Sequence, residues 1–291
     1  MKAPATGYVD AHHHVWSLAR GDYGWLTPDM TEIYRDFTLA DMEPLNEAAG
    51  ITATVLVQAA PTLDETHFLL KVAKESDGLV KGVVGWVDLA GADTIPTLTR
   101  LSRNPLLKAV RPMLQDLPDP AWILRADVGR ALSAMPRLGL RFDALVRPAQ
   151  LPALLPMLDR HPDLQVVIDH GAKPDIAGEM WEPWARSMRA AAANPKVRCK
   201  LSGLVTEAGP DWTIDTLRPY FDHLLDCFGA QRLMCGSDWP VVNLGGSYQR
   251  WYAATVALLA GLTPQERAAI MGGTARKFYG LYPVGEFTDR R

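Results

Sequence analysis

Short apolar runs alternate with amphipathic segments along almost the whole chain. Eight runs have the length and apolar character of buried strands, and they span residues 8–12, 52–58, 80–88, 107–112, 140–146, 164–170, 197–203 and 232–238. After each run, apolar residues recur every three or four positions, as in helices packed on one side, over residues 39–50, 63–76, 93–102, 127–139, 150–162, 181–193, 215–229 and 248–261. This alternation predicts right-handed βαβ units and a parallel sheet.

Eight such units in 291 residues favour an α/β fold of the distorted (β/α)8 barrel type. A doubly wound open sheet is the alternative, but no Gly-rich dinucleotide motif follows the first apolar run. No linker or internal repeat divides the chain, so residues 1–291 are expected to form a single domain. An extra C-terminal helix is predicted within 262–282, where Thr263, Pro264 and Glu266 fit a capping box. We expect it to pack on the outside of the barrel.

The longest connection runs from residue 15 to residue 37, between the first predicted strand and the first predicted helix. Long ordered loops are often lids or binding loops. This one carries Trp16, Tyr23, Trp25 and Tyr34, which could form aromatic walls over a site. The alternative is a hydrophobic plug that only closes the end of the barrel.

Charge and composition narrow the class of partner. The net charge is −3 with no block of like charges, which argues against a nucleic-acid partner or a polybasic membrane role. No apolar run approaches the ~18 residues of a membrane span, and the N-terminus lacks the apolar core of a signal peptide. Three cysteines are too few for a disulfide framework. We therefore expect a cytoplasmic protein acting on a small molecule, with a homo-oligomer left open.

Polar residues collect where the predicted strands end, which in a barrel is where catalytic groups sit. Because side chains alternate along a strand, His12 and His14 should share one face while His13 turns away into the wall. The sixth and eighth strands deliver His170 and Asp238 to the same end. Three imidazoles and a carboxylate can hold one divalent metal such as zinc and activate a bound water. A buried structural histidine pair is the alternative reading of His12 and His14.

The remaining strand ends suggest substrate contacts. We expect hydroxyl or carboxylate groups to be bound by Arg111, Gln58 and Lys173, and a ring to lie against Trp25, Trp86 and Trp239. The other histidines are less informative. We read His67 as packed on a helix face, His161 as a helix-end residue and His223 as a surface residue.

Several segments resemble the amidohydrolase superfamily: "VDAHHHVW", "VIDHGAKP", "CKLSGLVTEA", "GSDWPV" and "GGTARKFYGLY". More narrowly, they resemble its sugar-lactone hydrolases, related to L-fuconolactonase and L-rhamnono-lactonase, and more distantly 2-pyrone-4,6-dicarboxylate lactonase. The resemblance covers about residues 8–282 and implies a distorted barrel. It places His12, His14, His170 and Asp238 as the metal-binding and catalytic set.

The chain departs from the resembled pattern at two strands. The run "RFDALV" lacks the fifth-strand histidine of binuclear members, and no lysine stands at the fourth strand to bridge two metals. One metal is therefore implied rather than two. Related lactonases often have Arg-His at the fourth strand where this chain has Arg111-Pro112, and this difference leaves the identity of the sugar open.

The resemblance implies hydrolysis of a sugar lactone to the open-chain acid. Asp238 is the expected general base, and His12, His14 and His170 bind either one zinc or the developing oxyanion. Whether the metal is required is left open. The first alternative is a zinc-dependent decarboxylase of an aromatic or unsaturated acid on the same barrel. The second is a non-catalytic binding barrel, which has little use for these four side chains at one face.

Overall fold

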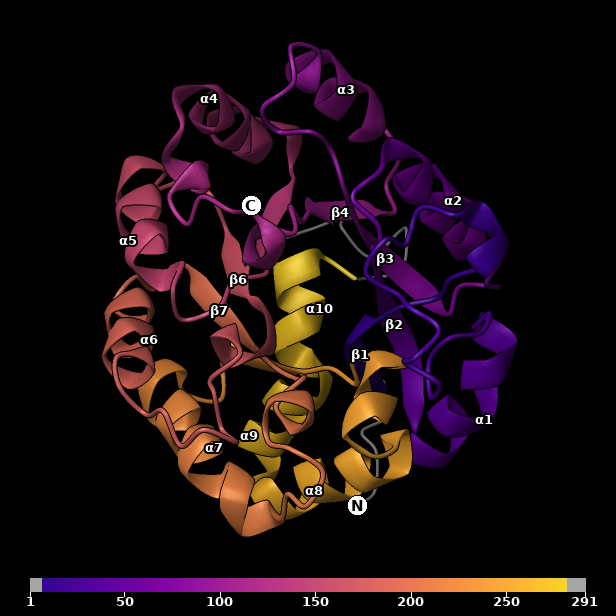
Figure 1. Cartoon of the computed structure of the whole chain (residues 1–291), viewed down its shortest axis with the longest axis vertical. Helices are drawn as coiled ribbons and strands as arrows, with labels where there is room; N and C mark the ends of the chain where they lie inside the picture. Colours follow the sequence, from indigo (N-terminus) through magenta and orange to yellow (C-terminus); the bar gives the residue numbers. More distant parts are fainter. Residues whose placement is uncertain (1–6, 282–291) are drawn as a thin grey trace.

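The computed structural model describes residues 7–281. Eight parallel strands lie in chain order around a barrel, with helices outside them (Figure 1). The strands are β1 (Tyr8–His13), β2 (Ile51–Val57), β3 (Val80–Gly85), β4 (Leu107–Val110), β5 (Arg141–Ala144), β6 (Val166–Ile168), β7 (Val197–Leu201) and β8 (Leu233–Cys235). The predicted (β/α)8 barrel is confirmed. Residues 1–6 and 282–291, the ends of the domain expected over 1–291, lie outside the described residues.

One helix follows each strand, as the alternating pattern predicts. These helices are α1 (Leu39–Ala49), α2 (Leu63–Lys74), α3 (Thr94–Leu101), α4 (Ala126–Ala134), α5 (Leu151–Arg160), α6 (Trp184–Ala192), α7 (Ile214–Phe228) and α8 (Tyr248–Leu258). Two more, α9 (Pro264–Ala268) and α10 (Thr274–Tyr279), follow α8. The predicted capping box is confirmed, because Thr263 Oγ1 accepts from the Glu266 amide while Glu266 Oε2 accepts from the Thr263 amide. Within residues 7–281 the longest helices are too short or too polar to cross a membrane.

The barrel closes between β1 and β8 at the point where β8 has already ended. The Asp238 amide donates to the His12 carbonyl over 2.8 Å, and the His14 amide donates to the Trp239 carbonyl over 2.7 Å. The side chain of Asp10 adds a third bond, since its Oδ1 accepts from the Ser237 amide at 2.9 Å. We call these contacts the closing seam. They fix the backbone of β1 against the loop after β8.

The interior of the barrel is a separate apolar core. Its wall consists mainly of small or β-branched side chains of the strands: Val9, Ala11, Ala53, Val55, Val57, Val84, Ala109, Val167 and Met234. Such short side chains cannot fill a barrel alone. The space is filled from one end by α10, whose Ala275, Phe278 and Tyr279 pack into the same core.

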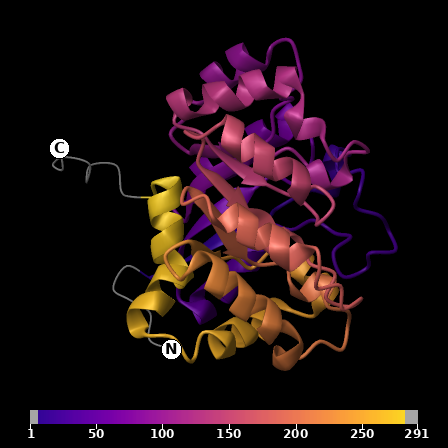
Figure 2. The same cartoon turned by 90° about the vertical axis from the view of Figure 1, so that its left-hand side faces the viewer.

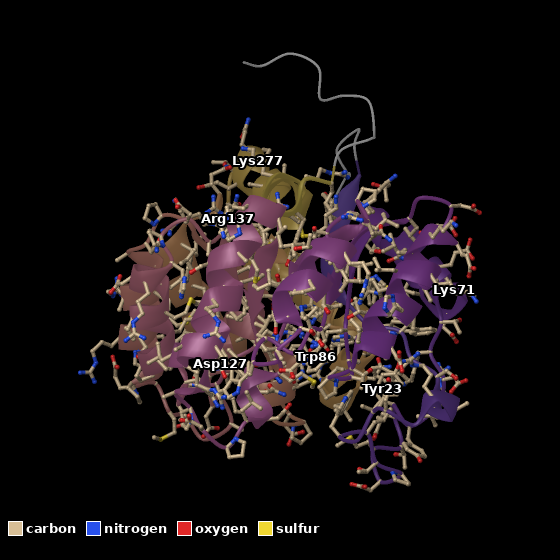
Figure 3. All side chains as sticks on the ribbon, turned by 90° about the horizontal axis from the view of Figure 1, so that it is seen from above. Tyr23, Lys71, Trp86, Asp127, Arg137 and Lys277 are labelled. Carbon is tan, nitrogen blue, oxygen red and sulfur yellow. The ribbon has the colours of Figure 1, made fainter. Side chains whose placement is uncertain are left out.

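The expectation that the C-terminal helix packs outside the barrel is therefore wrong. Helix α10 lies inside the ring of helices and strands (Figure 1), on the side of the molecule away from the loop after β1 (Figure 2). Figure 3 shows Lys277 of α10 toward one end of the barrel and Tyr23 and Trp86 toward the other end. Because Trp86 directly follows β3, α10 closes the amino-terminal end of the strands and leaves their carboxyl ends for chemistry.

The long loop 15–37 combines the two roles considered for it. Trp16 is buried and pairs with Phe37 across an antiparallel bridge, and its indole N–H donates to the Arg35 carbonyl over 2.8 Å. Tyr23 is also buried and donates to the carboxylate of Glu65 on α2 over 2.8 Å. Both act as packing, whereas Trp25 is half-buried and Tyr34 is 38% exposed. Only Trp25 remains available as an aromatic wall.

The hydroxyl of Tyr279 links α10 to the charged centre of the barrel, because it donates to Asp143 Oδ2 over 2.6 Å. We expect Tyr279→Phe to lower the free energy of unfolding by about 1.5–3 kcal/mol, the usual contribution of a buried hydrogen bond to a charged group. Urea unfolding followed by circular dichroism measures this, with Tyr34→Phe at an exposed position as the control. Equal stability of the two variants would show that the Tyr279 hydroxyl does not anchor the helix.

Candidate active site

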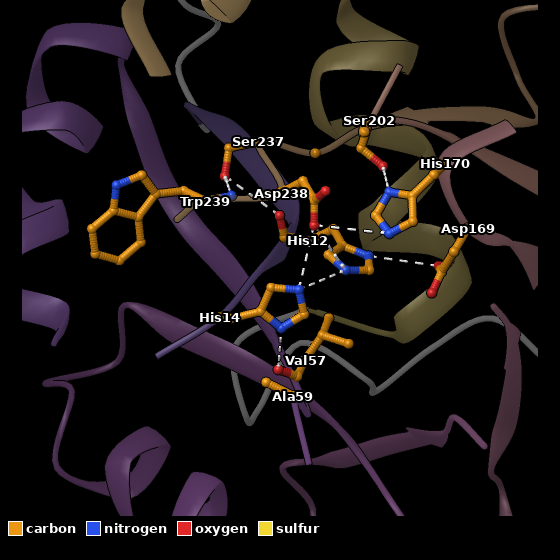
Figure 4. Close-up of polar contacts among 12 residues, drawn as sticks. His12, His14, Val57, Ala59, Asp169, His170, Ser202, Ser237, Asp238 and Trp239 are labelled. Carbon is orange, nitrogen blue, oxygen red and sulfur yellow. Dashed lines mark hydrogen bonds and ion pairs between the residues drawn. The ribbon is translucent and has the colours of Figure 1, made fainter. Parts of the chain in front are cut away.

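Four side chains meet at the carboxyl ends of β1, β6 and β8 (Figure 4). Asp238 Oδ1 lies 3.3 Å from His14 Nε2, 3.6 Å from His12 Nε2 and 3.8 Å from His170 Nε2. The Nε2 atoms of His12 and His14 are 3.2 Å apart. All four side chains are almost fully buried. The structure thus brings together the four residues that the sequence singles out.

The backbone at two of these residues is strained. His170 and Asp238 have φ values of 54° and 58°, in the left-handed region that residues other than glycine rarely adopt. Such strain persists only where surrounding contacts enforce it, and it concentrates at functional sites. At Asp238 the closing seam supplies that constraint, since the Asp238 amide is bonded to His12. The turn aims the carboxylate back over the end of the barrel, toward His12 and His14.

Two glycines allow the imidazoles their positions. A Cβ on Gly203 would lie 2.6 Å from Nδ1 of His170, and Gly203 has a φ of 63°. A Cβ on Gly236 would lie 2.7 Å from the Cβ of His12. Any larger side chain would therefore displace a histidine. These contacts explain the glycines in the segments "KLSG" and "CGSD".

The site holds a carboxylate among neutral imidazoles. Burial alone would raise the pKa of Asp238, but its interactions with His170, His14 and His12 outweigh burial and hold that pKa well below its usual range. Burial lowers the pKa of His170 to about 4 and also lowers the pKa values of His12 and His14. At neutral pH the folded protein therefore presents an ionised Asp238 and uncharged histidines.

The orientation of His14 fits a cation. Its Nδ1 lies 2.8 Å from the carbonyl oxygen of Val57, which can only accept, so Nδ1 carries the proton. In the neutral ring Nε2 then carries a lone pair, and it faces the ionised oxygen of Asp238. Two acceptors at this distance repel unless a cation or a proton lies between them. The set His12, His14 and Asp238, whose ligand atoms lie within 4.8 Å of one another, is therefore suited to a divalent metal.

Beneath the histidines lies a buried network of two cations and two carboxylates. Lys200 Nζ is 2.6 Å from Asp143 Oδ2, 3.0 Å from Asp169 Oδ1 and 3.1 Å from His12 Nδ1. Arg111 Nη1 is 3.2 Å from Asp169 Oδ2 and 3.3 Å from His12 Nε2. Buried charges are costly unless they are paired. Here the paired charges form a rigid floor under His12.

A cavity of about 300 Å³ opens above this floor, at the lower end of the size range of small-molecule sites. Among the candidates from the sequence, its wall includes His14, His170, Asp238, Arg111, Lys173 and Trp25. His12 lies just below, in contact with His14. Gln58, Trp86 and Trp239 are not among the described residues that line it.

The three residues outside the wall have other partners. The Gln58 amide donates to the Arg111 carbonyl over 2.7 Å, and Gln58 is fully buried. The Trp239 ring is buried and packs edge-on against Phe37, with centroids 5.2 Å apart. The Trp86 backbone is hydrogen-bonded through both its amide and its carbonyl to the hydroxyl of Thr66. The expected substrate contacts of these three residues therefore have no support from the lining of this cavity.

Two expectations for the outlying histidines are wrong. His67 is exposed on α2, because the helix turns its Leu69 and Leu70 side toward the barrel. His223 is buried between α6 and α7, where its Nε2 lies 2.8 Å from the Ala185 carbonyl. The third, His161, does cap the carboxyl end of α5 as expected. None of the three approaches the cavity.

Sequence reasoning missed the role of Glu207, which also lines the cavity. It follows β7 in the 3₁₀ helix Val205–Glu207, and its carboxylate lies 3.4 Å from Arg147 Nη1 and 3.9 Å from Lys173 Nζ. The only signal for it in the sequence is its place a few residues beyond a strand end. Nothing in the pattern shows that the loops after β5, β6 and β7 converge.

Comparison with known proteins assigns the chain to a family. The model of a family described as amidohydrolase matches residues 9–281. The chain is 45% identical over 277 residues to an L-fucono-1,5-lactonase of Burkholderia ambifaria, covering 94% of this chain and 95% of that protein. An L-fucono-1,5-lactonase of Burkholderia multivorans is 35% identical, with coverage of 94% and 96%.

Solved structures agree with these relatives. An amidohydrolase from Burkholderia multivorans with bound zinc superposes with a TM-score of 0.89 at 36% identity, covering 94% of this chain and 99% of that one. A 2,6-dihydroxybenzoate decarboxylase has a TM-score of 0.67 but only 14% identity, a likeness of fold alone.

His13 is fully buried and has no hydrogen-bond partner for either ring nitrogen within the described chain. Burial lowers its pKa from 6.5 to about 3. Between pH 5.5 and 4.5 the unfolded chain binds a proton here that the folded protein does not, so stability falls as the pH falls. We expect the unfolding free energy of His13→Leu to decrease over this range by about 1.4 kcal/mol less than that of the wild type.

Urea unfolding at the two pH values measures this difference. His67→Gln, which removes an exposed imidazole, is the control. If wild type and His13→Leu show the same pH dependence, then His13 takes up its proton in the folded protein.

Proposed function

Because the chain belongs to the amidohydrolase family, we propose that it hydrolyses the ring ester of a sugar lactone to the open-chain aldonic acid. The observation that carries the proposal is the ionised carboxylate of Asp238, in contact with three imidazoles at the wall of a small-molecule cavity. The names of the two relatives with 45% and 35% identity support this substrate class.

Asp238 acts as the general base. It removes a proton from the attacking water as the water adds to the lactone carbonyl, and it returns the proton to the ring oxygen when that oxygen leaves. The neighbouring imidazoles hold its pKa below its usual range, so the carboxylate is ionised at physiological pH and able to accept the proton. The strained turn and the closing seam hold it in place, so that little reorganisation is needed during the reaction.

The tetrahedral intermediate places negative charge on the former carbonyl oxygen. Arg111, at the base of the cavity, and His170, whose Nδ1 lies 2.9 Å from the Ser202 hydroxyl, are placed to stabilise this charge. A single divalent metal, which we propose to be zinc, would be held by His12, His14, His170 and Asp238, and when bound it would polarise the carbonyl and acidify the water. The lone pair on Nε2 of the neutral His14 ring faces Asp238 and supports the arrangement with a bound metal.

The remaining contacts concern the sugar. Lys173 lies at the wall beside His170, where burial lowers its pKa, and it is placed to bind ring hydroxyls. The indole N–H of Trp25 donates to the Ala59 carbonyl over 2.7 Å, so its ring offers an apolar face to the sugar.

We expect sugar lactones to be hydrolysed and aromatic acids to be left unchanged. A panel of aldonolactones assayed with a pH indicator, beside 2,6-dihydroxybenzoate assayed for loss of CO₂, distinguishes the two chemistries. Release of CO₂ without hydrolysis of any lactone would replace this proposal by the decarboxylase alternative.

Asp238→Asn preserves the shape of the side chain but removes the base. We expect kcat to fall by about 10²–10⁴-fold, the usual contribution of general-base catalysis, with a much smaller change in KM. Circular dichroism and thermal unfolding confirm that the variant is folded. Near-wild-type turnover would exclude Asp238 from the chemistry.

The same variant tests the role of the metal. If Asp238 serves mainly as a ligand, the variant loses bound metal in elemental analysis, and a chelator inactivates the wild type. If it serves as a base without metal, the chelator has no effect and the loss of kcat remains.

A further inference from the structure

The cavity has two chemically different halves, because the strand order separates the residues that form them. The loops after β5, β6 and β7 contribute Arg147, Lys173 and Glu207. The loops after β8 and β1, which adjoin each other at the closing seam, contribute Leu244, at 41% exposed, and Trp25. The same two loops also contribute His14 and Asp238. Apart from these two, one side of a bound molecule meets charged groups and the other side meets apolar surface.

Glu207 is the centre of the charged half. Arg147 Nη1 lies 3.4 Å from its Oε2, and Lys173 Nζ lies 3.9 Å from its Oε1. The side chain is only 15% exposed, so the two cations hold it in one orientation at the cavity wall. A carboxylate can accept about four hydrogen bonds, and these two contacts leave acceptor sites for ligand hydroxyls.

The charges of the cavity wall balance. Its described cations are Arg111, Arg147 and Lys173, and its carboxylates are Asp116, Glu207 and Asp238. These side chains therefore contribute equal numbers of positive and negative charges to the wall.

We propose that Glu207 determines substrate specificity: it accepts hydrogen bonds from ring hydroxyls of a neutral lactone and repels lactones that carry a carboxylate. The apolar half then receives the face of the ring, or a methyl substituent, that lacks hydroxyls. This inference rests on the proposed lactonase activity and specifies which lactones the cavity selects. Removing the negative charge of Glu207 would leave Arg147 and Lys173 unbalanced and ready to bind an anion.

Three substrates separate these contributions: L-fucono-1,5-lactone as a neutral hydroxylated ring, δ-valerolactone as a ring without hydroxyls, and 2-pyrone-4,6-dicarboxylate as an anionic ring. For Glu207→Gln we expect kcat/KM for the sugar lactone to fall roughly 10- to 100-fold, as for loss of hydrogen bonds to a charged group, mainly through KM. The value for δ-valerolactone should stay within about threefold, and the dicarboxylate should gain at least about tenfold relative to the sugar lactone.

Glu207→Asp distinguishes the effect of the negative charge from the effect of side-chain length. It retains the negative charge but shortens the side chain, so the sugar lactone should again lose activity while the dicarboxylate gains none. Glu182→Gln is the matched control, since Glu182 pairs with Arg186 on the exposed surface, with 3.7 Å between Oε2 and Nε. It should match the wild type on all three substrates.

Each outcome decides a different point. Equal losses on the sugar lactone and δ-valerolactone would show that Glu207 supports the catalytic centre, and unchanged specificity in Glu207→Gln would show that it does not select substrates. Either result overturns this inference but leaves the lactonase proposal intact. A wild type that hydrolyses none of the three lactones would instead contradict the proposed function itself.

Discussion

The closing seam between β1 and the loop after β8 is the interaction on which the site depends. It bonds the Asp238 amide to His12 and the His14 amide to Trp239, so the barrel closes through the same residues that meet in the candidate site. A carboxylate in a strained turn keeps its direction only while its backbone is held. The Asp10 side chain strengthens the seam by accepting from the amides of Ser237 and His12. The same hydrogen bonds therefore close the barrel and hold Asp238 in position.

The buried network of Lys200, Arg111, Asp143 and Asp169 connects His12 to the amino-terminal end of the barrel. Tyr279 on α10 bonds to Asp143, Asp143 pairs with Lys200, and Lys200 contacts His12. Two buried cations pair with two buried carboxylates, which is the condition under which buried charges are tolerated. Helix α10 therefore does more than fill the barrel, because its Tyr279 donates a hydrogen bond to Asp143, the partner of Lys200.

The chemistry of the cavity follows from this frame. A wall whose cationic side chains are balanced by carboxylates, with a fixed carboxylate base, suits an uncharged ester whose charge develops only during reaction. The same barrel shape occurs in a decarboxylase of low sequence identity, so the fold does not decide the reaction.

The sequence by itself determined the eight βα units, the capping box of α9 and the four residues His12, His14, His170 and Asp238, because periodicity and strand ends are local properties of a chain. It misplaced α10, His67 and His223, and it assigned substrate contacts to Gln58, Trp86 and Trp239, which lie outside the cavity wall. The pairing of Lys200 with Asp143 and the convergence of Arg147, Lys173 and Glu207 join residues that are far apart in the chain. Only the tertiary structure decides such contacts, because they depend on how the barrel closes and on which end of it α10 enters.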